Sequence, residues 1–283
     1  MNYSRMRLKD NKKQIHSDKP IITIITIVLN GDSILEETIL SVLNQTYNNI
    51  EYIIIDGGST DNTLNVIKKY EEKIDCWISE PDNGIYDAMN KGIDIATGEW
   101  INFMNAGDSF FSYEVLNLIF GKKINDNVSL LYGDTIYRNH DRGIIHIKPA
   151  KIKYLWKGMC FGHQASFVKT NVMKLYKYNV EYRNAADYNF IFSLYNDGYK
   201  FEYISIPVSL FLLGGISDNN VDSLKERMEI VFKKNKNIYY ILFYKYLLLA
   251  VKLRKLCIKI IGQSKYSLIR KIKWKIISLI KNI

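Results

Sequence analysis

Two acidic residues, Asp56 and Asp108, come shortly after apolar runs, Tyr52–Ile55 and Trp100–Met104, and a third such run, Ile21–Val28, precedes both. The near-continuous apolar content of these runs suits strands buried on both faces of a sheet. Ligands of an open α/β sheet bind outside the carboxyl ends of its strands, so we expect Asp56 and Asp108 to share one crevice. An acidic crevice suits a divalent metal ion, or the hydrogen-bonding groups of a base and ribose, better than a bare phosphate.

The elements that must position these carboxylates alternate between strand and helix patterns. Apolar residues recur at helical spacing in Asp32–Asn44, in Thr60–Tyr70 with Ser59 or Thr60 as its N-cap, and in Gly84–Ala96. The alternation predicts an α/β fold with a mostly parallel sheet and helices on both faces. The other expected elements are a helix at Asp187–Asn196 and strands at Ile74–Ser79, Leu130–Asp134, Ile144–Lys148 and Phe201–Leu212, of which the second and third are candidates for an antiparallel pair.

Length and composition describe an ordinary folded protein. The chain has 283 residues, 47% of them apolar and only four of them proline, which suits one large α/β domain or one domain with an appendage. Its cysteines, Cys76, Cys160 and Cys257, form no CxxC pattern and fit reduced thiols in a cytoplasmic protein. Residues 1–19 lack the apolar core of a signal peptide, and we expect them to be a flexible or weakly helical lead-in.

The charge is unevenly distributed along the chain. The net charge is +10, but every residue after Glu229 is neutral or basic, and 14 of these residues are Lys or Arg. The remaining 229 residues carry 25 basic and 29 acidic side chains, so the body is mildly acidic. This distribution argues against a body that binds nucleic acid and predicts that the tail meets an anionic surface.

Three segments carry a specific resemblance when they are taken together with Asp56: Glu80–Lys91 (EPDNGIYDAMNK), Asn105–Asp108 (NAGD) and Asn184–Phe190 (NAADYNF). They resemble the family 2 glycosyltransferases, in particular bacterial enzymes that assemble surface polysaccharides of the capsule or colanic acid type. The resemblance covers roughly residues 20–215. It implies a GT-A fold, a Rossmann-like and mostly parallel sheet flanked by helices. It also implies transfer of a sugar from a nucleotide-sugar, expected to be a UDP-sugar, to a glycan.

A donor site follows from the same resemblance. Asp56 would accept the N3–H of uracil, while the glycines after it let a ligand approach the backbone. Relatives often carry an Arg just before Asn90 to meet the diphosphate; here Met89 stands there, so Lys91 or a backbone donor would take that role. Without this context, Asp56 also fits a helix-capping loop residue, and Asn90 a solvated helix face. The expected nucleotide-binding residues are Thr26, Leu29, Asn30, Asp56, Asp82, Gly84, Asp87, Asn90, Lys91, Asn105 and Ala106.

The NAGD segment occupies the place of the family's metal-binding DxD-type motif. Asn105 and Gly107 replace two acidic positions, which leaves Asp108 as the sole carboxylate of the motif. The resemblance implies Mn²⁺ or Mg²⁺ on Asp108 and on the donor's diphosphate, since both ions take oxygen ligands. A metal-independent enzyme is the open alternative.

Asp187 is the expected general base, because inverting sugar transfer needs a group that takes the proton of the attacking hydroxyl. Relatives often carry Glu-Asp here, whereas this chain has Ala186 before Asp187. In isolation, an Asp before an aromatic helix is more often an N-cap. His163 and Gln164 occupy a loop that borders the acceptor in related enzymes, so they are acceptor-side candidates, although a structural role for His163 fits equally well.

These expectations divide the chain into a lead-in over residues 1–19, a GT-A domain over 20–220 and a helical basic tail over 221–283. Ile238–Leu253 is strongly apolar but falls short of the roughly 20 residues that cross a bilayer. A second stretch, Leu268–Lys281, has a cationic amphipathic pattern typical of an interfacial helix. We therefore expect a cytoplasmic enzyme attached peripherally to the inner face of the membrane, with an acceptor linked to a polyprenyl diphosphate. The alternative is a helical pair packed on the catalytic domain or on a second subunit.

Two rival classes remain at this stage. A non-catalytic partner with a GT-A fold in a membrane-associated polysaccharide assembly complex would explain the altered NAGD motif and Ala186. A nucleic-acid-binding protein driven by the tail conflicts with the acidic body. The chain contains neither GxGxxG nor GxxxxGK[ST], which argues against a dehydrogenase or a P-loop enzyme.

Overall fold

The computed structural model describes residues 3–5, 19–139, 143–212 and 221–262. The chain divides into two compact units, Met1–Ile216 and Ser217–Ile283, and each is described by itself. The first unit carries every site residue predicted above.

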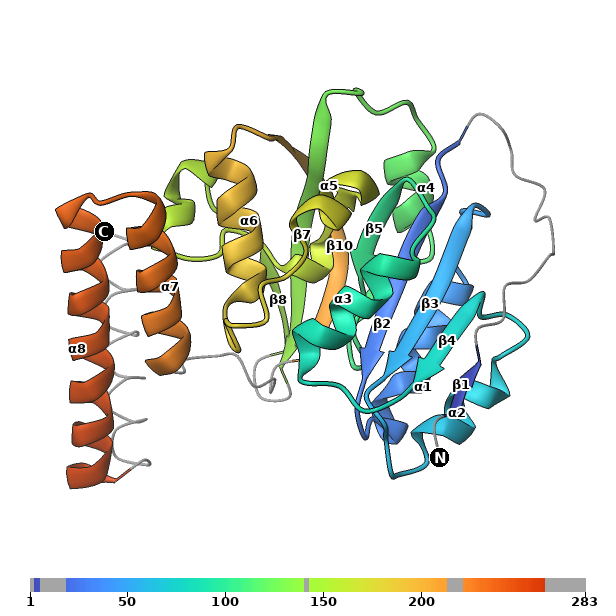
Figure 1. Ribbon diagram of the computed structural model, residues 1–283, viewed down its shortest axis with the longest axis horizontal. Helices are drawn as coiled ribbons and strands as arrows, with labels where there is room; N and C mark the ends of the chain where they lie inside the picture. The colour runs from blue at the N-terminus through green and yellow to red at the C-terminus, as the bar shows by residue number, and fades with distance from the viewer. Residues whose placement is uncertain (1–2, 6–18, 140–142, 213–220, 263–283) are drawn as a thin grey trace. The chain divides into compact units, whose positions relative to one another are not determined.

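One mixed β-sheet forms the centre of the first unit (Figure 1), with strands in the order β1-β4-β3-β2-β5-β9-β7-β10-β6 and with β8 paired to β7. The strands β4, β3, β2 and β5 are parallel neighbours, whereas β1, β8 and β9 pair antiparallel. The strands are β1 Tyr3–Arg5, β2 Ile22–Val28, β3 Ile50–Asp56, β4 Cys76–Ser79, β5 Trp100–Phe103, β6 Ser109–Phe110, β7 Val128–Asn139, β8 Gly143–Ile147, β9 Ser166–Lys169 and β10 Lys200–Leu212.

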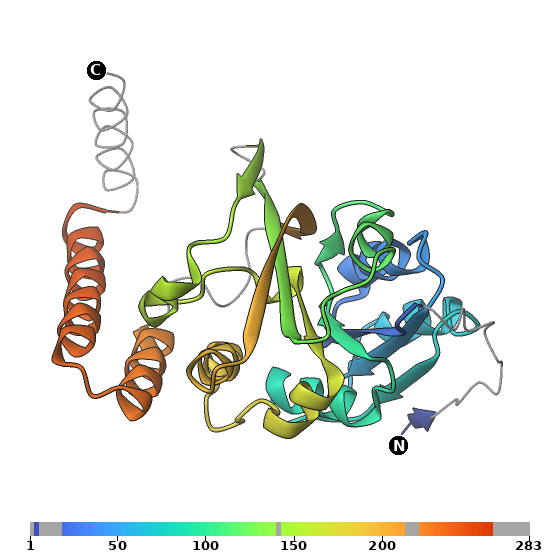
Figure 2. The same cartoon turned by 90° about the horizontal axis from the view of Figure 1, so that it is seen from above.

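Helices cover both faces of this sheet, with α1, α2 and α4 on one face and α3, α5 and α6 on the other (Figures 1 and 2). Gly92 in α3 lets that helix approach the sheet closely, because a Cβ there would lie 2.7 Å from the Ile25 side chain. The helices are α1 Asp32–Leu43, α2 Thr63–Lys69, α3 Ile85–Ile95, α4 Val115–Phe120, α5 Thr170–Tyr176 and α6 Ala186–Asn196, with short 3₁₀ helices η1 Ile152–Lys157 and η2 His163–Ala165.

The core explains why the sequence forms this sheet. All seven residues of β2 are buried, as expected for a strand covered by helices on both faces. Successive side chains of a strand point to opposite faces. Ile22 and Ile24 accordingly join the core cluster that contains Leu35 and Ile39 of α1, whereas Ile25 lies against α3.

The predicted α/β fold is confirmed, and the structure adds details that the sequence patterns did not show. Tyr3–Arg5 forms strand β1 against β4 where a flexible or weakly helical lead-in was expected. The antiparallel pairing of Ile144–Lys148 with the preceding strand is confirmed as β8 on β7. Helix α2 begins at Thr63, three residues later than predicted: the Ser59 hydroxyl donates back to Asp56, and Asp61 Oδ1 accepts from the Thr63 amide at the start of the helix.

The second unit contains two helices that pack on each other, α7 Val221–Lys234 and α8 Ile238–Ile261. None of the helices in the described ranges is long and apolar enough to cross a membrane. The amphipathic stretch predicted at Leu268–Lys281 lies outside the described residues.

Candidate active site

Asp56 ends β3, and its carboxylate is enclosed by donors from its own loop and from β4. Oδ2 accepts hydrogen bonds from the Gly58 and Ser59 amides at 3.2 and 3.1 Å, and from the Ser79 hydroxyl at 2.6 Å. Oδ1 accepts from the Ser59 hydroxyl. The residue is fully buried. Asp56 therefore organises the loop after β3, and a base would reach its carboxylate only after the Ser59 hydroxyl moves aside.

Asn30 ties the loop after β2 to this loop. Its backbone has the positive φ of 49°, a conformation that Asn tolerates better than most residues. Its amide donates to Ser59 Oγ at 2.7 Å, and its Oδ1 accepts from the Thr60 amide at 2.9 Å. Leu29 next to it is 58% exposed and lies beside Gly57. Leu29 and Asn30 therefore stand where an edge of a base pocket beside Asp56 would be.

Thr26 is fully buried in the middle of β2. Its hydroxyl donates to the Met104 carbonyl at 2.8 Å and lies 3.1 Å from the Tyr52 hydroxyl. Both hydrogen-bond contacts of its hydroxyl are therefore inside the protein, and the predicted contact of Thr26 with the nucleotide stays a prediction. Thr26 connects β2 to the segment that follows β5.

The segment from Glu80 to α3 folds back over the Asp56 loop. A Cβ at Gly57 would lie 2.3 Å from Asp82 Oδ2, so glycine is needed there for Asp82 to approach. Asp82 Oδ1 accepts from the Gly84 amide at 2.8 Å, and Asp87 Oδ2 accepts from the Asn83 amide at 3.0 Å. Asp82, Gly84 and Asp87 thus form a compact turn at the start of α3, next to the predicted base-binding loop.

Lys91 and Asn90 are engaged within the protein. Lys91 Nζ lies 2.8 Å from Glu80 Oε1 and donates to the Pro81 carbonyl at 3.2 Å. Asn90 donates to the Tyr178 carbonyl and accepts from the Tyr178 amide, both at 2.9 Å. Both polar groups of the Asn90 side chain are therefore used in a clamp on the Tyr178 backbone, and its predicted place in the donor site stays a prediction. The pattern at Asn90 gave no sign of this partner, which is 88 residues away in sequence.

The loop 105–108 follows β5 and presents oxygen atoms from Asn105 and Asp108. The Asn105 amide nitrogen faces His163 Nε2 at 3.4 Å, while Asn105 Oδ1 is buried and has no hydrogen-bond partner among the described residues. Asp108 is 6% exposed. Burial raises the pKa of Asp108 to about 7, and a hydrogen bond from the Gln164 side chain acts in the opposite direction. Ala106 is partly exposed in the same loop.

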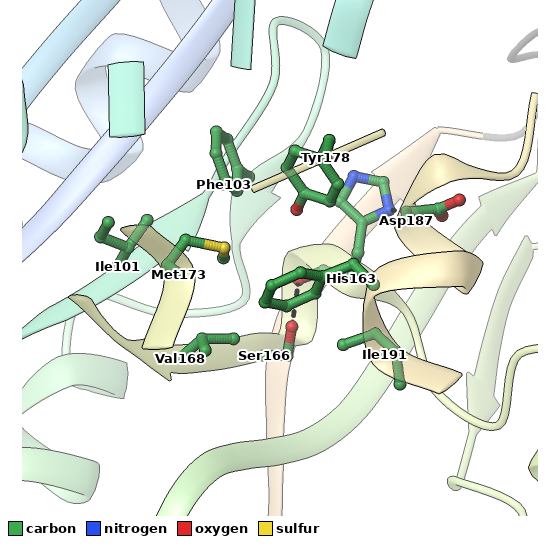
Figure 3. Close-up of a pocket in the computed structure, with 10 residues that line it drawn as sticks. Ile101, Phe103, His163, Ser166, Val168, Met173, Tyr178, Asp187 and Ile191 are labelled. Carbon is green, nitrogen blue, oxygen red and sulfur yellow. Dashed lines mark hydrogen bonds and ion pairs between the residues drawn. The ribbon is translucent and has the colours of Figure 1, made fainter. Parts of the chain in front are cut away.

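Asp187 lies in the first turn of α6, whose N-cap is Ala185, and its Oδ1 accepts from the Tyr188 amide of that turn at 2.8 Å. Oδ1 accepts from the Tyr86 hydroxyl at 3.0 Å, and Oδ2 lies 3.9 Å from His163 Nδ1. Figure 3 shows Asp187 beside His163 and Tyr178. The structure therefore brings the predicted base, the predicted acceptor-side His163 and the loop 105–108 into one contiguous group.

His163 lies between the two carboxylate-bearing segments, 3.4 Å from the Asn105 amide nitrogen and 3.9 Å from Asp187 Oδ2. Burial lowers its pKa, and the nearby Asp187 carboxylate opposes that shift. If the Asn105 amide donates to Nε2, the imidazole proton is on Nδ1, which faces Asp187. This arrangement also turns Asn105 Oδ1 away from His163, and that buried oxygen has no partner among the described residues.

A small apolar cavity lies beneath this group. Phe103, Met173 and Phe190 contribute to its wall, together with His163 and Asp187 (Figure 3). Its volume of about 10 Å³ holds about one water molecule and no sugar. The reacting groups of a substrate would therefore lie outside this cavity, on the solvent side of Asp187.

Four residues of the site escaped the sequence interpretation. Ser59 and Ser79 surround Asp56, Tyr86 donates to Asp187, and the Tyr178 ring lies 5.5 Å from the Tyr86 ring. Tyr86 stands within the segment EPDNGIYDAMNK and could have been included on that ground. Nothing in the sequence near Tyr178 indicates its place.

The strand order, the carboxylates after β3 and β5, and a third carboxylate on α6 define a glycosyltransferase with a GT-A fold. The chain belongs to glycosyl transferase family 2, whose family model matches residues 23–197. A PGL/p-HBAD biosynthesis glycosyltransferase of Mycobacterium bovis is 30% identical over 215 residues, which cover 72% of this chain and 81% of the relative. A glycosyltransferase of Haemophilus influenzae, described as uncharacterized, is 28% identical over 243 residues, which cover 80% of this chain and 96% of the relative.

Solved structures share the fold. TarS 1–349 of S. aureus in complex with UDP superposes with a TM-score of 0.61 and 18% identity, covering 75% of this chain and 64% of its own. The mannosyltransferase PcManGT from Pyrobaculum calidifontis, in complex with GDP-Man and Mn²⁺, has a TM-score of 0.61 and 14% identity, covering 91% of this chain and 80% of its own. Both likenesses confirm the GT-A architecture.

Proposed function

We propose that the protein transfers a sugar, with inversion, from a nucleotide-sugar to a hydroxyl of a glycan acceptor, with Asp187 as the general base. The observation that carries this proposal is the contiguous group Asn105–His163–Asp187–Tyr86, because it joins the donor-side loop after β5 to the predicted base. A UDP-sugar is the expected donor. TarS, which shares the fold, has been solved with UDP and with UDP-GlcNAc, whereas PcManGT has been solved with GDP-Man.

The proton transfer would proceed at Asp187. The acceptor oxygen attacks C1 of the sugar, its proton passes to a carboxylate oxygen of Asp187, and the bond from C1 to the diphosphate oxygen breaks. Oδ1 accepts from the Tyr86 hydroxyl at 3.0 Å and from the Tyr188 amide at 2.8 Å, so we assign the transferred proton to Oδ2. His163 Nδ1 lies 3.9 Å from Oδ2, and burial lowers the pKa of this imidazole.

The loop 105–108 fits a divalent cation that is shared with the substrate. Asn105 Oδ1 is a buried oxygen that lacks a partner among the described residues, and Asp108 adds a carboxylate. Groups of three or more His, Cys, Asp or Glu side chains suited to a metal are absent from the described residues. Oxygen ligands suit Mg²⁺ and Mn²⁺, which usually take only one or two protein carboxylates and complete their coordination with phosphates and water. Such an ion would neutralise charge on the departing diphosphate.

The acceptor and the location belong to the same proposal. We infer that the acceptor is a growing glycan on a polyprenyl diphosphate in the synthesis of a bacterial surface polysaccharide, and that the protein works peripherally on the inner face of the membrane. The basic residues after Glu229 support this proposal, since an enzyme with a lipid-linked acceptor gains from attachment to an anionic surface.

Thermal stability with nucleotides tests the donor site without knowledge of the acceptor. A ligand that binds the native state raises the melting temperature, so UDP, GDP and a panel of UDP-sugars can be compared with and without Mn²⁺. We expect a Mn²⁺-dependent shift with UDP, reduced in Asp108→Asn and unchanged in the surface variant Asp126→Asn. A larger shift with GDP would change the donor class, and the absence of any shift would favour the non-catalytic partner.

A further inference from the structure

Helix α8 carries an exposed apolar stripe along its length. Its members recur at spacings of three and four residues, and each is between 51% and 72% exposed. The set, called the α8 seam below, is Leu242, Tyr246, Leu249, Leu253, Leu256 and Ile260. Contiguous apolar surface of this kind is rare on a soluble protein that has no partner for it.

A second apolar stripe, on nearly the opposite side of α8, is buried or partly buried. Tyr244 is fully buried, and Ile241, Leu248 and Val251 are partly buried, at the same spacing of three and four residues. Helix α7 packs on α8 and contributes buried Ile230. The α8 seam is therefore a surplus apolar face beyond the one that holds the two helices together.

Charge decides what fits the α8 seam. Lys245, Lys252 and Lys259 form one row beside it at intervals of seven residues, about 10 Å apart along the helix. Arg254 and Lys255 add two further cations, and α8 contains no acidic residue. A second copy would bring two such cationic helices together without a carboxylate between them. An anionic lipid surface supplies the missing charge and accepts apolar side chains between its headgroups.

We propose that the α8 seam is a membrane-docking face, with the helix lying parallel to an anionic bilayer and the lysine row reaching its headgroups. At 24 residues the helix would cover about 36 Å of membrane surface. The inference deepens the proposed location of the enzyme by naming the surface that makes the contact. It uses no step of the glycosyl transfer, so the two proposals fail independently.

Flotation of the full-length protein with vesicles tests this face. Phosphatidylcholine vesicles with and without phosphatidylglycerol would be compared for the wild type, a seam variant (Leu249→Gln with Leu256→Gln) and a row variant (Lys245→Ser, Lys252→Ser and Lys259→Ser). The control removes three exposed lysines of the first unit (Lys73→Ser, Lys122→Ser and Lys123→Ser), which changes the net charge equally. Circular dichroism would verify that each variant is folded.

The wild type and the control are expected to float with phosphatidylglycerol vesicles. The row variant should lose about a hundredfold in partition, given roughly fivefold for each lysine at an anionic surface. The seam variant should lose at least tenfold on both vesicle types. Flotation of either α8 variant like the wild type would overturn the proposal. So would a wild type that does not float, and a dimer that the seam variant dissociates would assign the face to a second copy instead.

Discussion

The two carboxylate-bearing regions of the site differ in how their polar atoms are used. In the loop after β3, both oxygens of Asp56 are bonded by the protein itself, through two amides and the hydroxyls of Ser59 and Ser79. In the loop 105–108, Asn105 Oδ1 is buried and lacks a partner among the described residues, and the Asp108 carboxyl has a hydrogen bond with Gln164. The first region satisfies its carboxylate within the protein, whereas the second keeps one unsatisfied oxygen, Asn105 Oδ1.

Asp187→Asn should have the largest effect, because it removes the proposed base next to the loop 105–108 with little change in the shape of the side chain. We expect the rate of sugar transfer, or of donor hydrolysis if no acceptor is at hand, to fall by about 10²- to 10⁴-fold. Consumption of the nucleotide-sugar would be measured by chromatography, with Asp126→Asn as a control for the loss of a surface carboxylate. Equal rates in Asp187→Asn and the wild type would remove Asp187 from the mechanism.

Asp56→Ala should mainly reduce stability, since the hydrogen-bond donors around the carboxylate would lose their acceptor. Loss of a buried acceptor of this kind costs about 3 kcal/mol, or roughly 10 °C in melting temperature for a domain of this size. Ser79→Ala, which removes one of the four donors, should cost less. A melting temperature of Asp56→Ala within a degree of the wild type would show that the closed loop contributes nothing to stability.

Asp108→Asn should stabilise the metal-free protein in a pH-dependent way. The pKa of Asp108 is raised to about 7 in the folded state, so the folded protein holds a proton that the unfolded chain releases. The wild type therefore loses stability relative to the variant as the pH rises from about 4 to 7, by up to a few kcal/mol. Melting curves in a chelator at pH 4 and pH 8 would check this, with coincident curves expected at pH 4. A difference between variant and wild type that stays constant with pH would contradict the raised pKa.

Tyr86→Phe should have the smallest effect. It removes one hydrogen bond to Asp187 and keeps the aromatic contact with Tyr178, so we expect about a tenfold loss in kcat with little change in KM for the donor. Steady-state kinetics would separate the two parameters. A rise in KM alone would place Tyr86 in donor binding instead of in the orientation of the base.

The same comparison shows where sequence reasoning reaches its limit. The apolar content of Ile21–Val28 and of Tyr52–Ile55 is sufficient to predict two buried strands and the carboxylate that follows the second. The segments NAGD and NAADYNF also indicated Asp108 and Asp187 as candidate site residues. The partner of Asn90 could not be predicted, because its clamp on Tyr178 joins segments 88 residues apart through backbone atoms, which carry no sequence signal. The bond from Thr26 to the Met104 carbonyl could not be predicted for a related reason, since it depends on β5 lying beside β2.

The measurement that tests the account most directly is a calorimetric titration of UDP, with and without Mn²⁺, into the wild type, Asp108→Asn and Asp187→Asn. If the loop 105–108 binds the donor with its metal ion and Asp187 acts only as the base, Asp187→Asn should bind UDP–Mn²⁺ as tightly as the wild type. Asp108→Asn should lose the dependence on Mn²⁺. Equal losses of UDP–Mn²⁺ affinity in the two variants, or an undiminished Mn²⁺ dependence in Asp108→Asn, would contradict that division.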